Sequence, residues 1–158
     1  MKLYLLRHGK ADWPEWERPD DERPLNDEGI DEMHQVAPAF KCMKVKPALI
    51  LSSPLPRALM TAKIAAETLD TPLETRTELE PGFGRKECDA LIAAAPGGED
   101  LMIVGHEPDF STVIRSLTGG RVKLSKAAIA AIELPGEDAP AARLLWLFPP
   151  KMLIRLYR

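Results

Sequence analysis

Short runs of consecutive apolar residues alternate with longer segments of helical periodicity, and this alternation constrains the fold more than any other feature of the sequence. The runs are KLYLLR (2–7), ALILSS (48–53), LMIVG (101–105), AIAAIEL (128–134) and RLLWLF (143–148). Because the runs do not alternate with polar residues, they are typical of strands buried on both faces by helices. We therefore expect a three-layer α/β/α sandwich with a mainly parallel sheet.

The last two runs are joined by PGEDAPA, which is too short to hold a crossover helix. Parallel neighbours need such a crossover, so these two strands are expected to pair antiparallel at one edge of the sheet. The chain has 158 residues and no internal repeat. This length suits one well-packed domain, and residues 1–158 are expected to form a single one.

Helix start signals lie between the runs. Asn26 precedes a helical pattern that contains Pro38, and this proline is expected to kink or shorten the helix. Ser53 and Pro54 are the expected cap and first residue of the next helix. Two further helices are expected over 85–95 and 108–118.

Composition excludes several classes of function. The net charge is −3, so no overall basic field favours nucleic acid as a partner. No apolar stretch reaches the length of a membrane span or a signal peptide, and we expect a cytoplasmic protein without a membrane partner. Cys42 and Cys88 have no metal-type spacing and are expected to be reduced thiols. Neither begins a Cys-x5-Arg phosphate loop, which excludes one large class of phosphatases.

Basic side chains lie at two strand ends and at one helix start, all expected at the same edge of the sheet. Arg7 and His8 end the first strand, and His106 ends the strand over 101–105. Arg57 lies in the first turn of the helix that leaves the strand over 48–53. Because parallel strands share one carboxyl edge, where open α/β folds bind ligands, we expect these four residues to meet in one pocket.

This set of side chains suits the handling of a phosphoryl group. A guanidinium presents paired donors that match two phosphate oxygens, and the amino end of a helix adds backbone donors. A histidine beside two arginines resists protonation, which leaves its ring neutral and nucleophilic at physiological pH. Fixed cationic donors stabilise the charge that spreads during phosphoryl transfer. The sequence has no metal-ligand spacing, so neither a metal nor another cofactor is expected.

Three ordered motifs carry a resemblance to a known family. LRHG, SSPLPRALMTA and VGHEPD resemble the motifs of the histidine phosphatase superfamily, which includes the phosphoglycerate mutases. RPLNDEG, at 23–29, resembles the R-P-L-x-x-x-G stretch of SixA-type phosphohistidine phosphatases. The resemblance implies a phosphoglycerate mutase-like fold and a phosphohistidine intermediate on His8. It also implies that Arg7, Arg57 and His106 hold the phosphoryl oxygens.

Two departures from the family pattern bear on the site. Larger members carry an asparagine soon after the first motif, where this chain has KADW at 10–13. Arg23 either supplies that missing phosphate contact or pairs with the acids at 20–22. Many members carry a carboxylate as general acid in a midchain insertion that is short here. Glu80 is the first candidate for this acid and Glu107 the second.

The short midchain region, which offers no clear general acid, itself favours one substrate class. Breaking a P–N bond to imidazole needs less help for the leaving group than breaking a P–O ester. We therefore expect a metal-independent phosphatase that removes phosphate from phosphohistidine on a protein. The alternatives are a phosphatase of small phosphorylated metabolites and a phosphate-recognition module without catalysis.

The segment 12–24 is a long loop, dense in charge and proline, with two tryptophans. Long loops inside compact domains are often functional. Trp13 and Trp16 either line the mouth of the pocket or anchor the loop to the surface. Gly9, directly after the two basic residues, is expected to let the backbone turn close to a bound phosphate.

Overall fold

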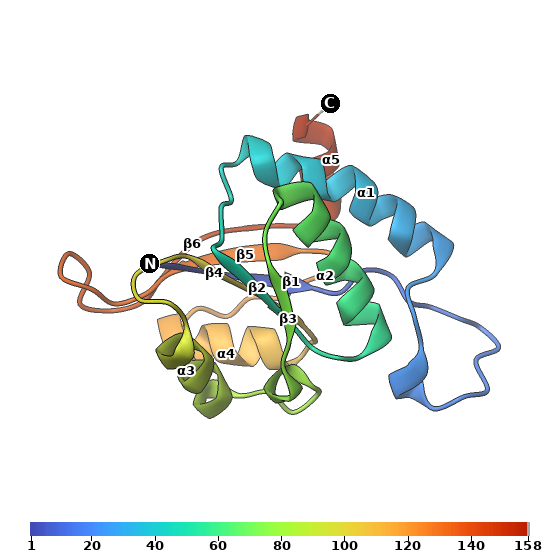
Figure 1. The fold of residues 1–158 in the computed structure, drawn as a ribbon, viewed down its shortest axis with the longest axis horizontal. Helices are drawn as coiled ribbons and strands as arrows, with labels where there is room; N and C mark the ends of the chain where they lie inside the picture. Colours follow the sequence, from blue (N-terminus) through green and yellow to red (C-terminus); the bar gives the residue numbers. More distant parts are fainter. Residues whose placement is uncertain (158) are drawn as a thin grey trace.

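The structure, a computed structural model, describes residues 1–157. In this part of the chain one six-stranded sheet has the order β3-β2-β4-β1-β5-β6 (Figure 1). β1 to β4 run parallel, and β5 pairs antiparallel with both β1 and β6. The expected mainly parallel sheet with an antiparallel edge is confirmed. The strands are β1 Lys2–Arg7, β2 Leu49–Ser52, β3 Leu73–Thr75, β4 Leu101–Gly105, β5 Ile129–Glu133 and β6 Arg143–Phe148.

Helices cover both faces of the sheet, as expected for a three-layer sandwich. Figure 1 shows α1, α2 and α5 on one face and α3 and α4 on the other. The helices are α1 Asp27–Cys42, α2 Pro56–Leu69, α3 Arg85–Ala94, α4 Asp109–Thr118 and α5 Pro150–Tyr157, and two short 3₁₀ turns lie at Asp20–Glu22 and Thr77–Leu79. Within residues 1–157, no helix combines the length and the apolar character that crossing a membrane requires.

The unbroken apolar run of β1 follows from its place in the middle of the sheet. Tyr4 and Leu6 pack into the core beneath α1 and α2, while Leu3 and Leu5 pack into the core beneath α3 and α4. All four side chains are buried because both faces of the strand are covered. Fully burying a side chain of this size contributes about 1.5–3 kcal/mol. The strand is thereby fixed in register, and so is the position at which it ends.

The structure corrects two of the expected helix signals. α2 begins at Pro56, so Pro54 does not open it, and Ser53 is a buried residue before the helix that does not cap it. Pro56 takes the first helical position instead, where its missing N–H costs nothing. α1 continues past Pro38 to Cys42 and is not shortened there.

Two elements have no counterpart among the sequence expectations. β3 has only three residues and lies at the edge of the sheet beside β2. α5 has eight residues and begins at the second of two consecutive prolines, Pro150, so its sequence pattern is short. Leu153 of α5 is fully buried in the core that α1 and α2 also cover. Tertiary packing therefore decides both elements.

The amino end of α1 is packed against the chain that leaves β1. The side chain of Asn26 accepts a hydrogen bond from the Gly29 N–H at 2.8 Å, which confirms the expected helix start. A Cβ atom on Gly29 would lie 2.1 Å from the carbonyl oxygen of Lys10. The glycine is thus required by close approach of two backbones.

Gly9 is packed closely against residues around the start of α1. It is not among the residues with positive φ, so no left-handed turn explains it. A Cβ atom there would lie 3.3 Å from Leu25 and 3.4 Å from Met33. Gly9 therefore lets the chain pack tightly beneath the start of α1.

Candidate active site

Two histidines meet where the central strands end. The parallel register places Arg7 of β1 opposite Gly105 of β4, so the residues that follow, His8 and His106, are neighbours. Their ring centroids are 5.3 Å apart, and both side chains are buried. The structure therefore brings the ends of these two strands together, as expected.

The backbone on both sides holds His8 in place. Its N–H donates to the Gly105 carbonyl at 3.1 Å, and its own carbonyl accepts from the Ala127 N–H at 3.0 Å. Its Nδ1 lies 2.7 Å from the Gly9 carbonyl oxygen. Because a carbonyl can only accept, Nδ1 carries the proton in this contact and Nε2 keeps a free lone pair.

His106 is oriented by a side chain from a neighbouring strand end. Its Nε2 lies 2.9 Å from the hydroxyl of Ser53, which follows β2. Its Nδ1 is buried and has no hydrogen-bond partner among the described residues. Sequence reasoning gave Ser53 a capping role, whereas the structure makes it a partner of His106.

The site contains two guanidinium groups, one from Arg57, which is buried, and one from Arg7, which is half-buried. One terminal nitrogen of Arg7 donates to the Leu124 carbonyl at 2.9 Å. Arg57 donates to the backbone carbonyl of Asp20 at 3.0 Å, and its other terminal nitrogen lies 3.5 Å from the Asp20 carboxylate. The Nε atoms of both arginines are buried without a partner in the described part of the chain. Buried donors are normally paired, so these vacant donors favour a ligand that accepts hydrogen bonds.

Thr61 links the two halves of the site, and sequence reasoning did not single it out. Its hydroxyl donates to the Arg57 carbonyl at 2.8 Å and accepts from the Gly9 N–H at 3.0 Å. The residue is fully buried on α2. Its position four residues after Arg57, on the same helix face, was the signal available in the sequence.

The environment keeps both histidines neutral. The pKa of His8 is lowered from 6.5 to about 3, mainly by burial and to a smaller extent by the neighbouring His106, Arg57 and Arg7. Burial likewise lowers the pKa of His106 to about 4, again with help from the two arginines. From the sequence, only the two arginines were expected to keep the ring neutral, whereas burial has the larger effect on both pKa values.

A cavity of about 380 Å³, here called the histidine pocket, contains these groups. It brings together Arg7, His8, Arg57 and His106, which the sequence selected. Glu107 also lines it, whereas Glu80 is exposed and is not among the lining residues. The pocket is lined by Arg7, His8, Asp12, Asp20, Asp21, Arg23, Arg57, Pro81, His106, Glu107 and Lys126.

Arg23 lines the histidine pocket and pairs with Asp20, so the expected pairing with the acids at 20–22 is confirmed. Its Nε lies 3.0 Å from the Asp20 carboxylate, and a terminal nitrogen donates to the Ala11 carbonyl. Asp20 therefore contacts Arg23 through one oxygen and Arg57 through the other.

Lys126 is a cation of the pocket that sequence reasoning missed. Its ammonium lies 2.7 Å from both carboxylate oxygens of Asp12, and this contact lowers the pKa of Asp12. Lys126 lies in an irregular segment next to Ala127, which binds the His8 carbonyl. No strand or motif in the sequence marked this position, because only the folded chain brings it beside His8.

Comparison with known proteins assigns the chain to a family. Residues 3–89 match the model of the histidine phosphatase superfamily (branch 1), which is more than half of the chain. The chain belongs to the histidine phosphatase superfamily. An uncharacterised protein of Picosynechococcus sp. is 33% identical over 147 residues, which cover 84% of each chain.

Relatives with a described activity are similar over most of the chain. Phosphohistidine phosphatase SixA of Escherichia coli is 28% identical over 140 residues, covering 85% of this chain and 86% of that protein. A structure of the protein histidine phosphatase SixA complexed with tungstate has a TM-score of 0.84 and 28% identity, covering 97% of this chain and 99% of the other. A SixA structure from Agrobacterium tumefaciens, at 24% identity and a TM-score of 0.80, shares the fold over 94% of this chain and 97% of its own. These comparisons support phosphatase activity.

Proposed function

We propose that this histidine phosphatase removes phosphate from phosphohistidine on a protein, through a covalent phosphohistidine on His8. The observation that carries the proposal is the Nδ1 contact of His8 with the Gly9 carbonyl, which leaves Nε2 as the free nucleophile. Buried, unpartnered donors on Arg7, Arg57 and His106 stand ready for phosphoryl oxygens.

In the first step, Nε2 of His8 attacks the substrate phosphorus in line with the leaving nitrogen. The new N–P bond forms as the substrate P–N bond breaks, and the leaving imidazole keeps the electron pair and takes up a proton from water. In the second step, water attacks the phosphorus, releases inorganic phosphate and returns His8 to its neutral form. The low pKa of His8 keeps the nucleophile unprotonated at neutral pH.

The side chains around His8 stabilise the transferred group. Arg7 and Arg57 bind phosphoryl oxygens through their vacant donors, and Arg23 adds a third guanidinium. When the Ser53 hydroxyl donates to Nε2 of His106, the ring carries its proton on Nδ1 and donates it to a phosphoryl oxygen. Lys126 adds a further positive charge, so the chain's own cations supply the charge stabilisation without a metal.

Glu107 is the better placed of the two acid candidates. It lines the histidine pocket, whereas Glu80 does not. One oxygen of Glu107 is engaged by the Ser111 N–H of α4, at 2.6 Å. A leaving imidazole needs less help from an acid than a leaving alkoxide. A site in which one acid candidate is exposed and the other is engaged by backbone therefore favours a P–N substrate over a phosphate ester.

Substrate comparison with a labelled intermediate tests the proposal. The wild-type enzyme is expected to hydrolyse a phosphohistidine protein faster than any member of a panel of phosphate esters. Brief reaction with radiolabelled substrate is expected to leave acid-labile label on wild type and none on His8→Ala. That variant is expected to lose essentially all activity, with circular dichroism confirming that it remains folded.

Three results would contradict the proposal in different ways. An active His8→Ala enzyme would exclude the mechanism. Faster turnover of the esters would favour a phosphatase of small metabolites. Tight binding of phosphoproteins without any labelled intermediate would favour a recognition module.

A further inference from the structure

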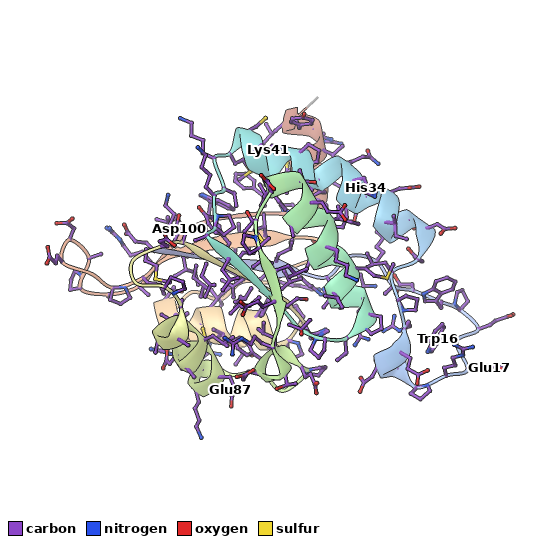
Figure 2. The ribbon with its side chains drawn as sticks, viewed as in Figure 1. Trp16, Glu17, His34, Lys41, Glu87 and Asp100 are labelled. Atoms are coloured by element: carbon purple, nitrogen blue, oxygen red, sulfur yellow. The ribbon has the colours of Figure 1, made fainter. Side chains whose placement is uncertain are left out.

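The loop after His8 forms a second hollow beside the histidine pocket. A groove of about 510 Å³, here called the tryptophan groove, is lined by Asp12, Trp13, Pro14, Trp16, Arg18, Asp20 and Arg23. It shares three lining residues, Asp12, Asp20 and Arg23, with the histidine pocket. Figure 2 shows Trp16 and Glu17 on this loop, which stands away from the helices and the sheet. The two hollows therefore adjoin each other at these shared residues.

The two indole rings are anchored through their N–H groups and remain partly accessible. Nε1 of Trp13 donates to the Pro24 carbonyl at 3.0 Å, and Nε1 of Trp16 donates to the Pro19 carbonyl at 3.1 Å. The ring centroids are 6.0 Å apart. Trp13 is 40% exposed, whereas Trp16 is half-buried. Anchored aromatic side chains that remain partly exposed are typical of binding surfaces.

The loop that forms the groove is acidic. Residues 12–22 carry six exposed acids and one exposed arginine, Arg18. Asp12 and Asp20 pair with cations of the histidine pocket. The other four acids have no ion pair within the described residues, and they are Glu15, Glu17, Asp21 and Glu22. A surface of this charge attracts a partner with basic side chains and repels an acidic metabolite.

We propose that the tryptophan groove is the docking site for the polypeptide segment that flanks the phosphorylated histidine. An apolar side chain of that segment packs on Trp13 and Trp16, and basic side chains face the acids of the loop. This inference rests on the proposed function, because the phosphoryl group must enter the histidine pocket at the same time. The groove is larger than the histidine pocket, about 510 Å³ against about 380 Å³, so it has room for side chains beyond the phosphoryl group.

The test compares substrates that differ only in what surrounds the P–N bond. Phosphoramidate is the small substrate, and three phosphohistidine peptides carry leucine and arginine, glycine, or leucine and glutamate beside the histidine. Wild type is expected to prefer the leucine and arginine peptide. The double variant Trp13→Ala, Trp16→Ala is expected to lose about tenfold or more in kcat/KM on that peptide. Its kcat/KM on phosphoramidate is expected to stay within about twofold of wild type.

A second variant removes the charge preference without touching the rings. The double variant Glu15→Lys, Glu17→Lys is expected to shift the preference toward the leucine and glutamate peptide. Leu145→Ala, which truncates a comparably exposed apolar side chain on the edge strand β6, is the matched control and is expected to act like wild type on every substrate.

The possible failures are distinguishable. If the tryptophan variant loses phosphoramidate turnover as strongly as peptide turnover, the rings only hold the loop and the docking site is excluded. Equal turnover of all three peptides by wild type also overturns it, while the proposed function stands. Absence of phosphoramidate and phosphohistidine turnover in wild type overturns both.

Discussion

Asp20 places a carboxylate between two arginines of the histidine pocket. One oxygen lies 3.0 Å from Arg23 and the other 3.5 Å from Arg57, while the backbone carbonyl of Asp20 accepts from Arg57. A phosphoryl group in the histidine pocket is expected to contact the same two guanidinium groups. We therefore expect the Asp20 carboxylate to compete with a bound phosphoryl group for these arginines.

Asp20→Asn is consequently expected to tighten the binding of inorganic phosphate or tungstate roughly five- to tenfold, because a neutral amide competes less for the arginines. Titration calorimetry measures the two Kd values. Glu22→Gln removes the same charge from the same 3₁₀ turn but lies outside the pocket lining, so it is expected to change the Kd less than twofold. Weaker binding by Asp20→Asn would instead show that Asp20 positions the arginines.

The start of α1 and the segment that follows β1 form one packed unit. The Asn26 N–H donates to the Lys10 carbonyl at 3.0 Å, and Gly29 lies directly against the backbone of Lys10. The glycine of the RPLNDEG motif thus has a packing role, whereas Arg23, at the other end of the motif, lines the histidine pocket. One helix start therefore holds both the segment after His8 and the loop beside it.

Gly29→Ala is expected to destabilise the fold by more than about 2 kcal/mol, because the new Cβ atom meets backbone that cannot rotate away. Urea unfolding followed by circular dichroism measures the loss. Gly97→Ala is the control, since a Cβ atom there meets nothing within 4 Å. Similar stabilities for the two variants would contradict the backbone contact at Gly29.

The fold as a whole buries two neutral histidines at the ends of its central strands, β1 and β4. Each has a pKa well below 6.5 in the folded state, about 3 for His8 and about 4 for His106. The unfolded chain binds protons at these residues as the pH falls below about 6.5, whereas the folded chain does not. Stability is therefore fully present above this pH and is lost toward the folded pKa values.

Between about pH 7 and pH 5, each buried histidine is expected to remove on the order of 2 kcal/mol from the free energy of unfolding. Urea unfolding at both pH values measures this difference, and His8→Gln is expected to reduce it. His34, which is exposed on α1, provides the control substitution His34→Gln, which is expected to leave the difference as in wild type. An equal effect of the two variants would show that burial of His8 is not the cause.

The sequence by itself determined the layers, the strand edge and the four residues that meet there. Continuous apolar runs report burial on both faces, and a parallel sheet brings the ends of distant strands together, so Arg7, His8, Arg57 and His106 could be grouped before any coordinates. Local signals were sufficient because each residue stands directly after a strand or in the first turn of a helix.

Only the tertiary structure decided the remaining parts of the site. The contacts of Lys126 with Asp12 and of Ser53 with His106 join residues far apart in the chain, and no local pattern encodes such pairs. The same holds for β3 and α5, which are too short to be stable alone and exist because neighbouring elements bury or pair them. Periodicity records how a segment meets the core, whereas the pairing of side chains depends on where the whole chain places them.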